Sequence, residues 1–566
     1  MKIKESYIKT IAVLVIIAVI ASAFVIAKKR KAHEEAGSFD GYYIYNNTIM
    51  TEGMPDFSQD VHKVENKGEG VVYTNYPFGY KIAFPKSAEF DLSTSNIMTR
   101  AVIDGDIDFT VTKEWSPYED SVTYIKEYTN RYMMDPNYIE GNKLTMHKDE
   151  IIEVGDYRMQ YIIFTRETPE NGLHKKNTYA HCYLYTDTQR FYRMTFNAYE
   201  YNEEFLNLVE YVTQSIDENV EIQGKPGFYL NIEPELPQNW NEETKRTYEN
   251  IVNRETPAWG IFRPQSVKDD ALYKINAVEE KIDNQFVVAL DYMYFGEEVP
   301  IAGMKTAYSQ GKLVELTMQI STVMHQNLNG PNPFFEVLDG TRDDYIREIA
   351  RELRDFEHPF MFRLNNEMNT DWTSYGGACI INEPELFKEV WIHIYEIFEE
   401  EGVNNAIWIF NPNDRNCPPN EYNHFINYYP GNKYAQVFGI TGYNTGTYYA
   451  DVFGEEWREF EEIYDNIYNN CEQYFGKFPW MITEFSSSSV GGDKVQWINN
   501  MFEVLPKYDN LKIAVWFCSV DYDFRISLSG GIVARPYLLD ETDETAKAFS
   551  EGLEKSGYEP KSLFSE

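Results

Sequence analysis

Two glutamates accompany apolar runs of the kind that form buried strands. Glu367 comes shortly after PFMFRL (359–364), and Glu484 lies inside PWMITEF (479–485). Either carboxylate alone is weak evidence, because the chain has 90 Asp and Glu residues and most must face solvent. A facing pair means more, because glycoside hydrolysis needs one protonated and one ionised carboxyl across the scissile bond. A separation of roughly 5–5.5 Å would indicate an enzyme that retains the anomeric configuration.

Other side chains near these glutamates suit a sugar site. Arg363, in the first of the two runs, can hydrogen-bond a carboxylate and keep it ionised. Asp523 and Arg525 follow the last apolar run and add groups that can bind hydroxyls. Sugar rings stack on large aromatic faces. The aromatic candidates, each of which would alternatively be a core residue, are Trp372, Trp408, Tyr443 and Trp516.

Eight short apolar runs alternate with amphipathic stretches in the second half of the chain. Eight strand–helix repeats predict a (β/α)8 TIM barrel over residues 257–566, although a doubly wound open sheet gives a similar pattern. Chemistry in such a barrel sits at the C-terminal ends of the strands. The predicted strands are 258–262, 286–295, 313–320, 359–364, 405–410, 436–443, 479–485 and 512–518. The predicted helices are 343–356, 384–401, 455–474, 493–505 and 544–555.

A smaller α+β domain is expected before the barrel. Residues 37–222 alternate with period 2, as antiparallel strands do, and have helical patterns at 121–133 and 203–216. Nothing in this domain suggests chemistry, so we interpret it as a spacer or interaction module of unknown ligand. Residues 223–256 contain several prolines and are expected to form a linker or a wrapping segment.

The N-terminal segment, residues 1–36, has the pattern of a membrane anchor. Its apolar run, 11–27, has lysines on both sides and just reaches the length of about 17–25 residues that spans a bilayer. Ala21-Ser22-Ala23 resembles a signal-peptidase site, but the run continues beyond it, which favours an uncleaved single-pass anchor over a secretion signal. Charge on both flanks leaves the orientation open. A polysaccharide substrate is met outside the cell, so we expect the cell membrane as the location, with the barrel extracellular.

Composition narrows the partners. There are 51 Lys and Arg residues against 90 Asp and Glu, a net charge of −39, which argues against nucleic acid as a partner. The five cysteines are scattered and indicate neither a disulfide framework nor a metal site. We expect no metal and no organic cofactor. The sequence does not indicate the oligomeric state.

The barrel resembles glycoside hydrolase family 26, a retaining family best known for β-mannanases with some β-glucanases and β-xylanases. The resemblance covers residues 257–554. It implies that Glu367 is the general acid/base, Glu484 the nucleophile, Tyr443 a hydrogen-bonding partner near the nucleophile, and Trp516 the platform under the sugar. The segments that carry it are FRLNNEMNTDW (362–372), WIFNPND (408–414), GITGYN (439–444), PWMITEFSSSSVGGDKVQWI (479–498) and VWFCSVDYDFRI (515–526). In the last segment, Asp523 and Arg525 occupy the family's D-W-R positions, with Phe524 in place of Trp.

Two departures from the family pattern bear on specificity. Asn366 stands where the family's mannanases usually have His, and Met318-Gln319 stands where they usually have Trp-His. Mannan is the first expected substrate, followed by β-glucan or β-xylan. The two replacements suggest a drift from mannose, whose 2-hydroxyl is axial, toward sugars with an equatorial 2-hydroxyl. Substrate binding is therefore expected to involve Gln319 and Asn366.

The expected mechanism is double displacement. Glu484 attacks the anomeric carbon while Glu367 protonates the leaving oxygen, and Glu367 then deprotonates the water that releases the sugar. The alternative is a membrane-tethered carbohydrate-binding or cell-surface scaffold protein on a barrel that has lost catalysis. An enzyme acting on the cell's own envelope glycans is also open.

Overall fold

The computed structural model describes residues 62–170, 172–225, 227–321, 328, 330–525 and 531–565, with the backbone of two short strands, β1 (Tyr43–Tyr45) and β2 (Thr48–Met50). The expected anchor run, residues 11–27, lies outside these described residues. Within them, no helix combines the length and apolar character needed to cross a bilayer.

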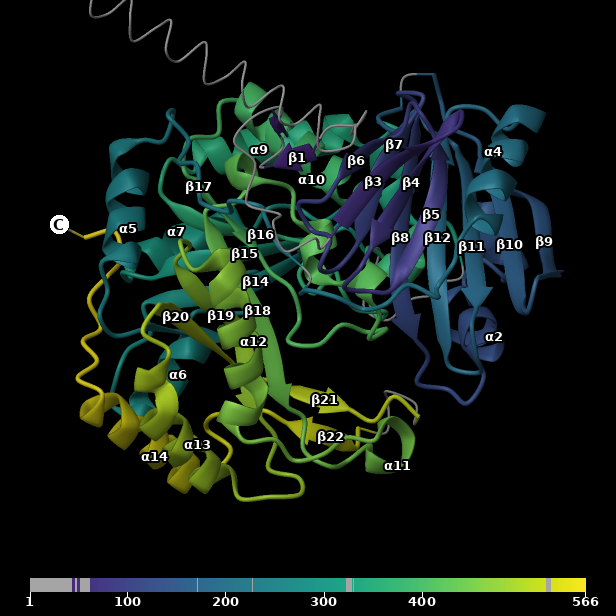
Figure 1. Ribbon diagram of the computed structural model, residues 1–566. Helices are drawn as coiled ribbons and strands as arrows, with labels where there is room; N and C mark the ends of the chain where they lie inside the picture. The colour runs from purple at the N-terminus through teal and green to yellow at the C-terminus, as the bar shows by residue number, and fades with distance from the viewer. Residues whose placement is uncertain are drawn as a thin grey trace, which may run out of the picture.

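Eight parallel strands close into a barrel in the C-terminal half of the chain (Figure 1). Each strand pairs with the next, and the last pairs with the first. The predicted (β/α)8 barrel is therefore confirmed, and each predicted run overlaps one strand. The strands are β13 (Ala258–Phe262), β14 (Val288–Tyr294), β15 (Leu313–Gln319), β16 (Phe360–Leu364), β17 (Ala406–Phe410), β18 (Val437–Asn444), β19 (Trp480–Ser487) and β20 (Leu511–Phe517).

Amphipathic helices surround the barrel and bury their apolar faces against its strands. The predicted helices are present, except that the one expected at 455–474 begins later, at Phe460. The helices are α6 (Tyr273–Ile282), α7 (Ile301–Ser309), α8 (Pro333–Leu338), α9 (Asp343–Asp355), α10 (Pro384–Glu400), α11 (Ala450–Phe453), α12 (Phe460–Phe475), α13 (Lys494–Val504) and α14 (Asp543–Lys555). A hairpin of β21 (Val520–Tyr522) and β22 (Val533–Pro536) follows the last barrel strand.

The barrel interior is a separate apolar core to which all eight strands contribute residues. Its N-terminal end is closed by α5 (Glu242–Val252), whose Tyr248 and Ile251 belong to this core together with Trp240. The segment expected to link or wrap, residues 223–256, thus wraps the barrel and ends in a helix that seals it. The pattern did not predict this helix, because its apolar face is short.

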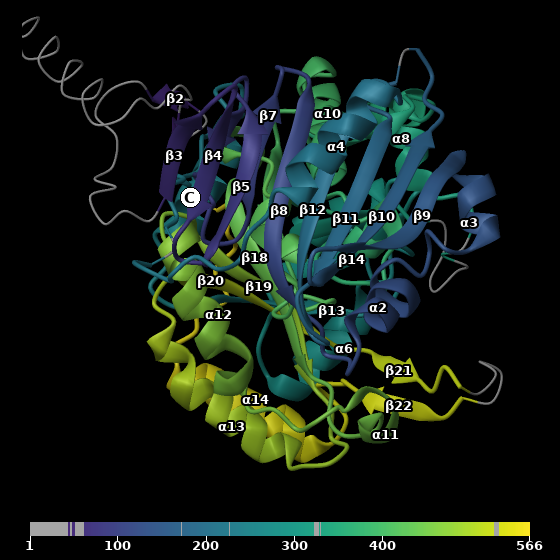
Figure 2. The same ribbon diagram turned by 45° about the vertical axis from the view of Figure 1, so that its right-hand side comes forward.

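The region before the barrel is built on a nine-stranded sheet in the order β2-β1-β6-β7-β8-β12-β11-β10-β9 (Figure 2). The sheet strands of this region are β6 (Glu89–Asp91), β7 (Thr99–Ile103), β8 (Ile107–Trp115), β9 (Leu144–Val154), β10 (Tyr157–Arg166), β11 (Thr178–Tyr185) and β12 (Arg190–Ala198). A second sheet contains β3 (His62–Lys67), β4 (Gly70–Asn75) and β5 (Tyr80–Pro85). The helix expected at 203–216 is α4 (Glu203–Gln214). The one expected at 121–133 is shorter and changes its winding, from α2 (Ser121–Tyr124) to a π-helical turn (Ile125–Thr129), with α3 (Pro136–Gly141) following.

The two faces of the large sheet have different partners. Along β11, Ala180, Cys182 and Leu184 pack with the small sheet and α4, whereas Tyr179 and Tyr183 belong to the core shared with the barrel. Strand alternation explains this division, because neighbouring side chains point to opposite faces. The N-terminal region and the barrel therefore share one continuous apolar core.

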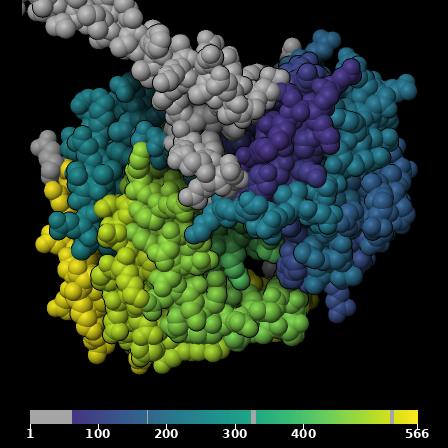
Figure 3. Space-filling model, in the orientation of Figure 1, coloured from purple at the N-terminus to yellow at the C-terminus, as the bar shows by residue number. Residues whose placement is uncertain are grey.

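The N-terminal region also contacts the loops that follow β16 and β17. Figure 3 shows this region, in purple and blue, packed against the green part of the barrel. The Tyr138 hydroxyl donates to the carbonyl of Cys379 (2.6 Å), and Arg193 Nη2 donates to the carbonyl of Asn382 (2.8 Å). Glu114 accepts a hydrogen bond from the backbone amide of Tyr422 (2.9 Å). A region interpreted from sequence as a spacer thus lies directly against the functional end of the barrel.

Candidate functional site

Glu367 and Glu484 both lie at the C-terminal end of the barrel, one just after β16 and the other in β19. The backbone that presents Glu367 is unusual: Asn365 and Glu367 have φ values of 51° and 58°, which residues with a side chain rarely adopt. Hydrogen bonds to the ends of the neighbouring strands stabilise this backbone conformation. Asn365 Oδ1 accepts from the amide of Ile320 (2.8 Å), and the amide of Glu367 donates to the carbonyl of Asn411 (2.8 Å). Such enforced conformations cluster at functional sites.

Asn366 connects the two carboxylates. Its Nδ2 lies 3.2 Å from Glu367 Oε2 and 3.3 Å from Glu484 Oε1, so these two oxygens are at most 6.5 Å apart. The orientation of the amide is fixed from behind, because Asn366 Oδ1 accepts from Gln319 Nε2 (2.8 Å) and from the Tyr375 hydroxyl (3.1 Å). The predicted residues Gln319 and Asn366 therefore act as one unit that holds the carboxylate pair.

Glu484 is buried and receives three donors. Besides Asn366, the Thr441 hydroxyl lies 3.3 Å from Oε1 and Arg363 Nη2 lies 3.5 Å from Oε2. Burial, with a smaller contribution from the negative charge of Asp521, raises the pKa of Glu484 to about 8. The three donors favour the ionised form.

Glu367 has a different set of neighbours. Its Oε1 accepts a hydrogen bond from Asn413 Nδ2 (2.6 Å). Burial raises the pKa of Glu367, and the contacts with Asn413, Arg363 and Trp372 oppose this rise only in part. Trp372 is 48% exposed and lies at the opening beside this carboxyl. A raised pKa suits a group that must donate a proton.

Arg363 is a fixed centre of positive charge under the site. Its side chain is fully buried, Nε lies 2.7 Å from the Thr317 hydroxyl, and Nη1 donates to Asn411 Oδ1 (2.9 Å). The guanidinium also lies over the ring of Tyr292, 5.4 Å from its centroid. These contacts fix the direction in which Nη2 points, which is toward Glu484.

Residues 270–470 match the family model described as Glycosyl hydrolase family 26. This part of the chain, called the family-26 segment below, is similar to that family, which confirms the resemblance seen in the sequence. The family-26 segment contains Glu367, Asn366 and Asn413 and ends before Glu484.

Two curated proteins are similar in sequence to the family-26 segment. Endoglucanase H of Acetivibrio thermocellus is 29% identical over 198 residues, which are 34% of this chain and 21% of that protein. A mannan endo-1,4-beta-mannosidase of Bacillus subtilis is 25% identical over 146 residues, which are 24% of this chain and 38% of that protein. The chain thus spans well under half the length of the curated relatives it matches.

Solved structures of family-26 proteins are similar at lower identity. The catalytic domain of a GH26 endo-beta-1,4-mannanase from Bacillus sp. JAMB-750 is 13% identical, with a TM-score of 0.42, covering 58% of this chain and 93% of that chain. GH26A from Muricauda sp. is 18% identical, with a TM-score of 0.36, covering 50% and 90%.

Two tryptophans expected at the opening of the barrel do not lie there. Trp516 is fully buried, its indole donates to the carbonyl of Tyr537 (2.9 Å), and it packs against Trp497 and Phe549 of the outer helices. Trp408 likewise packs against residues of α10. Both side chains point outward from their strands, so the expectation that they contact sugar is corrected: they are core residues.

Phe517, the next residue after Trp516, has the position that was expected for the tryptophan. Its ring stacks on Phe262 (4.7 Å between centroids) and meets Tyr443 edge to face (5.8 Å). Tyr443 is at the opening as predicted, but it packs on Phe517 and Tyr537, and no hydrogen bond joins its hydroxyl to Glu484 among the described residues. On this side of the site, where β20 contributes no tryptophan, the aromatic wall therefore consists of phenylalanine and tyrosine.

Asp523 and Arg525 lie farther along, in the loop after β21. They form a bidentate ion pair with each other, and the Tyr448 hydroxyl donates to Asp523 Oδ2 (2.9 Å). No hydrogen bond or ion pair between described residues joins this pair to Glu367 or Glu484. Their part in substrate binding stays a prediction, as does the expectation of no metal or cofactor.

Sequence reasoning missed four polar residues of the site. Asn411 and Asn413 were visible as part of WIFNPND at a strand end, where a polar cluster after an apolar run is a signal. Thr441 lies within a predicted strand and gave no such signal. Tyr375 lies in the loop after β16, and only the folded structure brings it to Asn366.

Proposed function

We propose that the protein is a retaining β-glycoside hydrolase acting on a neutral β-linked polysaccharide. One observation carries the proposal: a single amide nitrogen, Asn366 Nδ2, reaches both buried carboxylates and limits their nearest oxygens to 6.5 Å. A water molecule held for direct attack needs a wider gap of about 6.5–9.5 Å between carboxyls, whereas double displacement uses about 5–5.5 Å.

In this proposal Glu484 is the nucleophile. Three donors converge on it and one of them carries a full positive charge, so they stabilise the ionised carboxylate that attacks the anomeric carbon. Burial opposes them and raises the pKa of Glu484 to about 8, so the ionised form predominates only above this pH. Glu367, with its raised pKa, donates its proton to the leaving oxygen. It then takes a proton from the water that hydrolyses the glycosyl-enzyme, and the sugar leaves with its configuration retained.

The substrate class is supported by the relatives and by Asn366. The two curated relatives are named as an endoglucanase and a mannan endo-1,4-beta-mannosidase, and the second name specifies a β linkage. We propose mannan and β-glucan as the first two substrates, followed by β-xylan. Asn366 lies between the carboxylates, where its amide can donate to the 2-hydroxyl of the bound sugar. Because the preferred direction of that hydroxyl differs between mannose and glucose, the ratio of activities on the two polymers reports what Asn366 selects.

We also propose that the barrel acts outside the cell, held at the membrane by residues 11–27. The support is the apolar pattern of that run and the size of a polysaccharide, which does not cross a bilayer. Protease accessibility of the barrel on intact cells tests this location.

The decisive experiment is hydrolysis of β-mannan, β-glucan and β-xylan by the purified full chain, with Glu367→Gln and Glu484→Gln as parallel variants. We expect activity on at least one polymer, loss of at least about a thousandfold in both variants, and a first-formed product of β configuration by NMR. Binding without turnover would instead favour the tethered scaffold, and a first-formed α product would exclude the retaining mechanism.

A further inference from the structure

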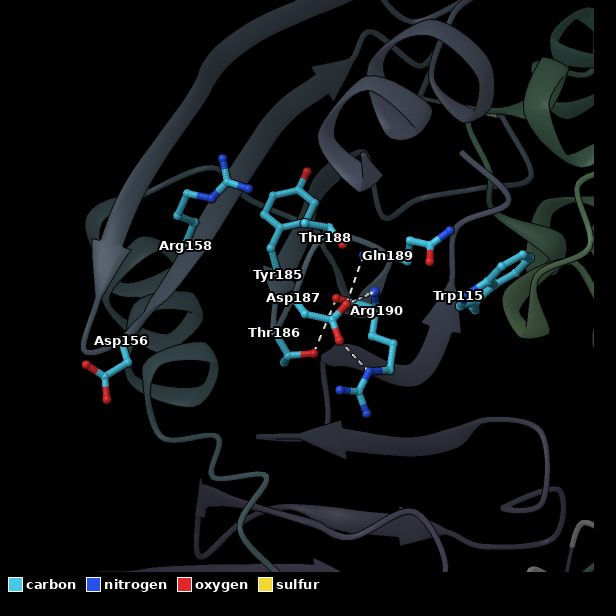
Figure 4. Close-up of a pocket in the computed structure, with 9 residues that line it drawn as sticks. All are labelled: Trp115, Asp156, Arg158, Tyr185, Thr186, Asp187, Thr188, Gln189 and Arg190. Atoms are coloured by element: carbon cyan, nitrogen blue, oxygen red, sulfur yellow. Dashed lines mark hydrogen bonds and ion pairs between the residues drawn. The ribbon is translucent and has the colours of Figure 1, made fainter. Parts of the chain in front are cut away.

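A second hollow lies in the N-terminal region, away from the carboxylate pair. It has a volume of about 510 Å³. It lies at the ends of four neighbouring strands of the large sheet, where β8 and β11 end and β10 and β12 begin. Figure 4 shows Arg158 and Trp115 at either side, with the Asp187–Arg190 ion pair between them in this view. Trp115 and Arg190 are cross-strand neighbours, so both stand at the same strand end.

The lining of this hollow has the chemistry of a sugar subsite. Trp115 is 52% exposed, so a large part of its indole is open to solvent and available to a ligand. The Arg158 guanidinium, the Asp156 carboxylate and the Thr188 hydroxyl form no hydrogen bond or ion pair with any described residue. Together they offer donors and acceptors beside an aromatic face, which is how proteins bind the hydroxyls and the apolar face of a sugar ring.

The charges of the lining indicate a neutral ligand. Two arginines and two aspartates line the hollow, and Arg190 is already paired with Asp187, 2.6 Å from Nε to Oδ2. The remaining pair, Arg158 and Asp156, sums to zero. An acidic polymer would also meet the overall charge of −39, which opposes its approach.

Contacts between neighbouring residues connect this hollow with the catalytic opening. Next to the exposed Trp372, Asp371 Oδ2 accepts from Arg131 Nη2 (3.0 Å). The Arg131 guanidinium lies 5.0 Å from the ring centroid of Tyr128, and that ring lies 6.3 Å from Tyr118.

Tyr118 completes the connection. It is 40% exposed, and its carbonyl accepts from Gln189 Nε2 (3.1 Å), a residue of the hollow. Both ribbon views place α2 toward the same side of the molecule as the β21–β22 hairpin, which follows the last barrel strand (Figure 1, Figure 2). A series of polar and aromatic contacts, which is called the aromatic path below, therefore connects the residue beside Trp372 with the hollow.

We propose that the hollow at Trp115 is a remote binding site for the same neutral β-linked glycan chain that the catalytic site cleaves. This proposal rests on the proposed function and adds a role for the N-terminal region. A chain long enough to occupy both sites gains affinity from the second contact, because that contact forms at high effective concentration. A short oligosaccharide reaches the catalytic site alone and gains nothing.

The test compares Trp115→Ala and Arg158→Ala with the parent full chain on a β-glycan polymer and on a short oligosaccharide of the same linkage. We expect KM for the polymer to rise about fivefold to tenfold in Trp115→Ala, because the variant loses one aromatic stacking contact. The kcat and the KM for the oligosaccharide should stay unchanged. Trp115→Phe should keep most of the affinity. Tyr273→Ala on α6 is the matched control, because Tyr273 is also a large aromatic, is 69% exposed and lies outside the aromatic path.

Binding without turnover gives a second readout. In a Glu484→Gln background, adding Trp115→Ala should weaken polymer binding by the same factor. Unchanged polymer KM in both Trp115→Ala and Arg158→Ala overturns the remote site and leaves the hydrolase proposal standing. A parent that binds polymer through Trp115 without cleaving it overturns the hydrolase instead. Preferential binding of a polyuronate overturns the assignment of a neutral ligand.

Discussion

Glu315 lies directly behind Arg363, with Oε1 of the carboxyl 3.2 Å from Nε of the guanidinium, and both side chains are fully buried. Burial raises the pKa of Glu315 to about 7, against the opposing charge of Arg363. Arg363 therefore has two carboxyls at two of its nitrogens, Glu315 below and Glu484 above. The charge that Glu315 carries decides how strongly the electrostatic field of Arg363 acts on Glu484.

Replacing Glu315 with Gln should lower the pKa of Glu484. The variant removes a negative charge near Arg363, so the guanidinium acts on Glu484 alone and stabilises its ionised form. The acidic limb of the kcat/KM profile should move to lower pH by about one pH unit. A profile measured from pH 4.5 to 9 checks this, and an unchanged limb would mean that Glu315 is protonated throughout.

In the parent, kcat/KM should rise as the pH increases from 6 toward 8. Glu484 must be ionised to attack, and its folded-state pKa of about 8 places this ionisation well above the usual range of a glutamate. An acidic limb near pH 4.5 would contradict this expectation. The free energy of unfolding should change with pH in the opposite direction to the activity. Because the pKa of Glu484 is higher in the folded state than in the unfolded state, its contribution to stability is fully present below the unfolded-state pKa and is lost as the pH rises through the folded-state value of about 8.

The roles of the two glutamates can be separated with activated substrates. An aryl glycoside with a good leaving group needs no proton, so Glu367→Ala should form the glycosyl-enzyme at close to the parent rate and then accumulate it. Glu484→Ala should lose both the polymer and the aryl glycoside activity. The measurement is a pre-steady-state burst, which should be present in Glu367→Ala and absent in Glu484→Ala. Equal losses of aryl glycoside activity in both variants would contradict the assignment of Glu367 as the acid/base and Glu484 as the nucleophile.

Asn366→Ala should lower kcat by about tenfold to a hundredfold, because an oriented donor to charged groups in the site is lost. Gln319→Ala is its control, since it leaves the amide in place and removes only one of the two hydrogen bonds that orient it. The loss in Gln319→Ala should be smaller. Equal losses would mean that orientation, rather than the Asn366 donor itself, carries the effect.

Adjacent aromatic residues should respond in opposite ways. Trp516→Ala should lower the free energy of unfolding by about 3–5 kcal/mol, because it empties a fully buried site among the outer helices. Phe517→Ala should cost less stability and raise KM, because its ring lies in the wall of the opening. Urea unfolding and steady-state kinetics of both variants test whether Trp516 points outward from β20 and Phe517 points into the opening, as described above.

The sequence was sufficient for the strands and for the location of the two glutamates at the C-terminal end of the barrel, because strand ends can be recognised in a repeated βα pattern. It was not sufficient for the direction of Trp516 and Phe517. Strands of a parallel barrel are apolar on both faces, so LKIAVWF has no alternation from which to read which side points inward. Residues such as Tyr375 join the site through a loop, and no spacing along the chain indicates that contact.

The contacts between the N-terminal region and the loops of the barrel determine whether the barrel can be separated from the rest of the chain. The carbonyls of Cys379 and Asn382 take their donors from Tyr138 and Arg193, and the amide of Tyr422 takes its acceptor from Glu114. A barrel excised at residue 257 would keep Glu367 and Glu484 and lose the groups that shape the loop behind Glu367. Heat or urea should melt both halves in one transition, and the excised barrel should appear inactive for want of its scaffold.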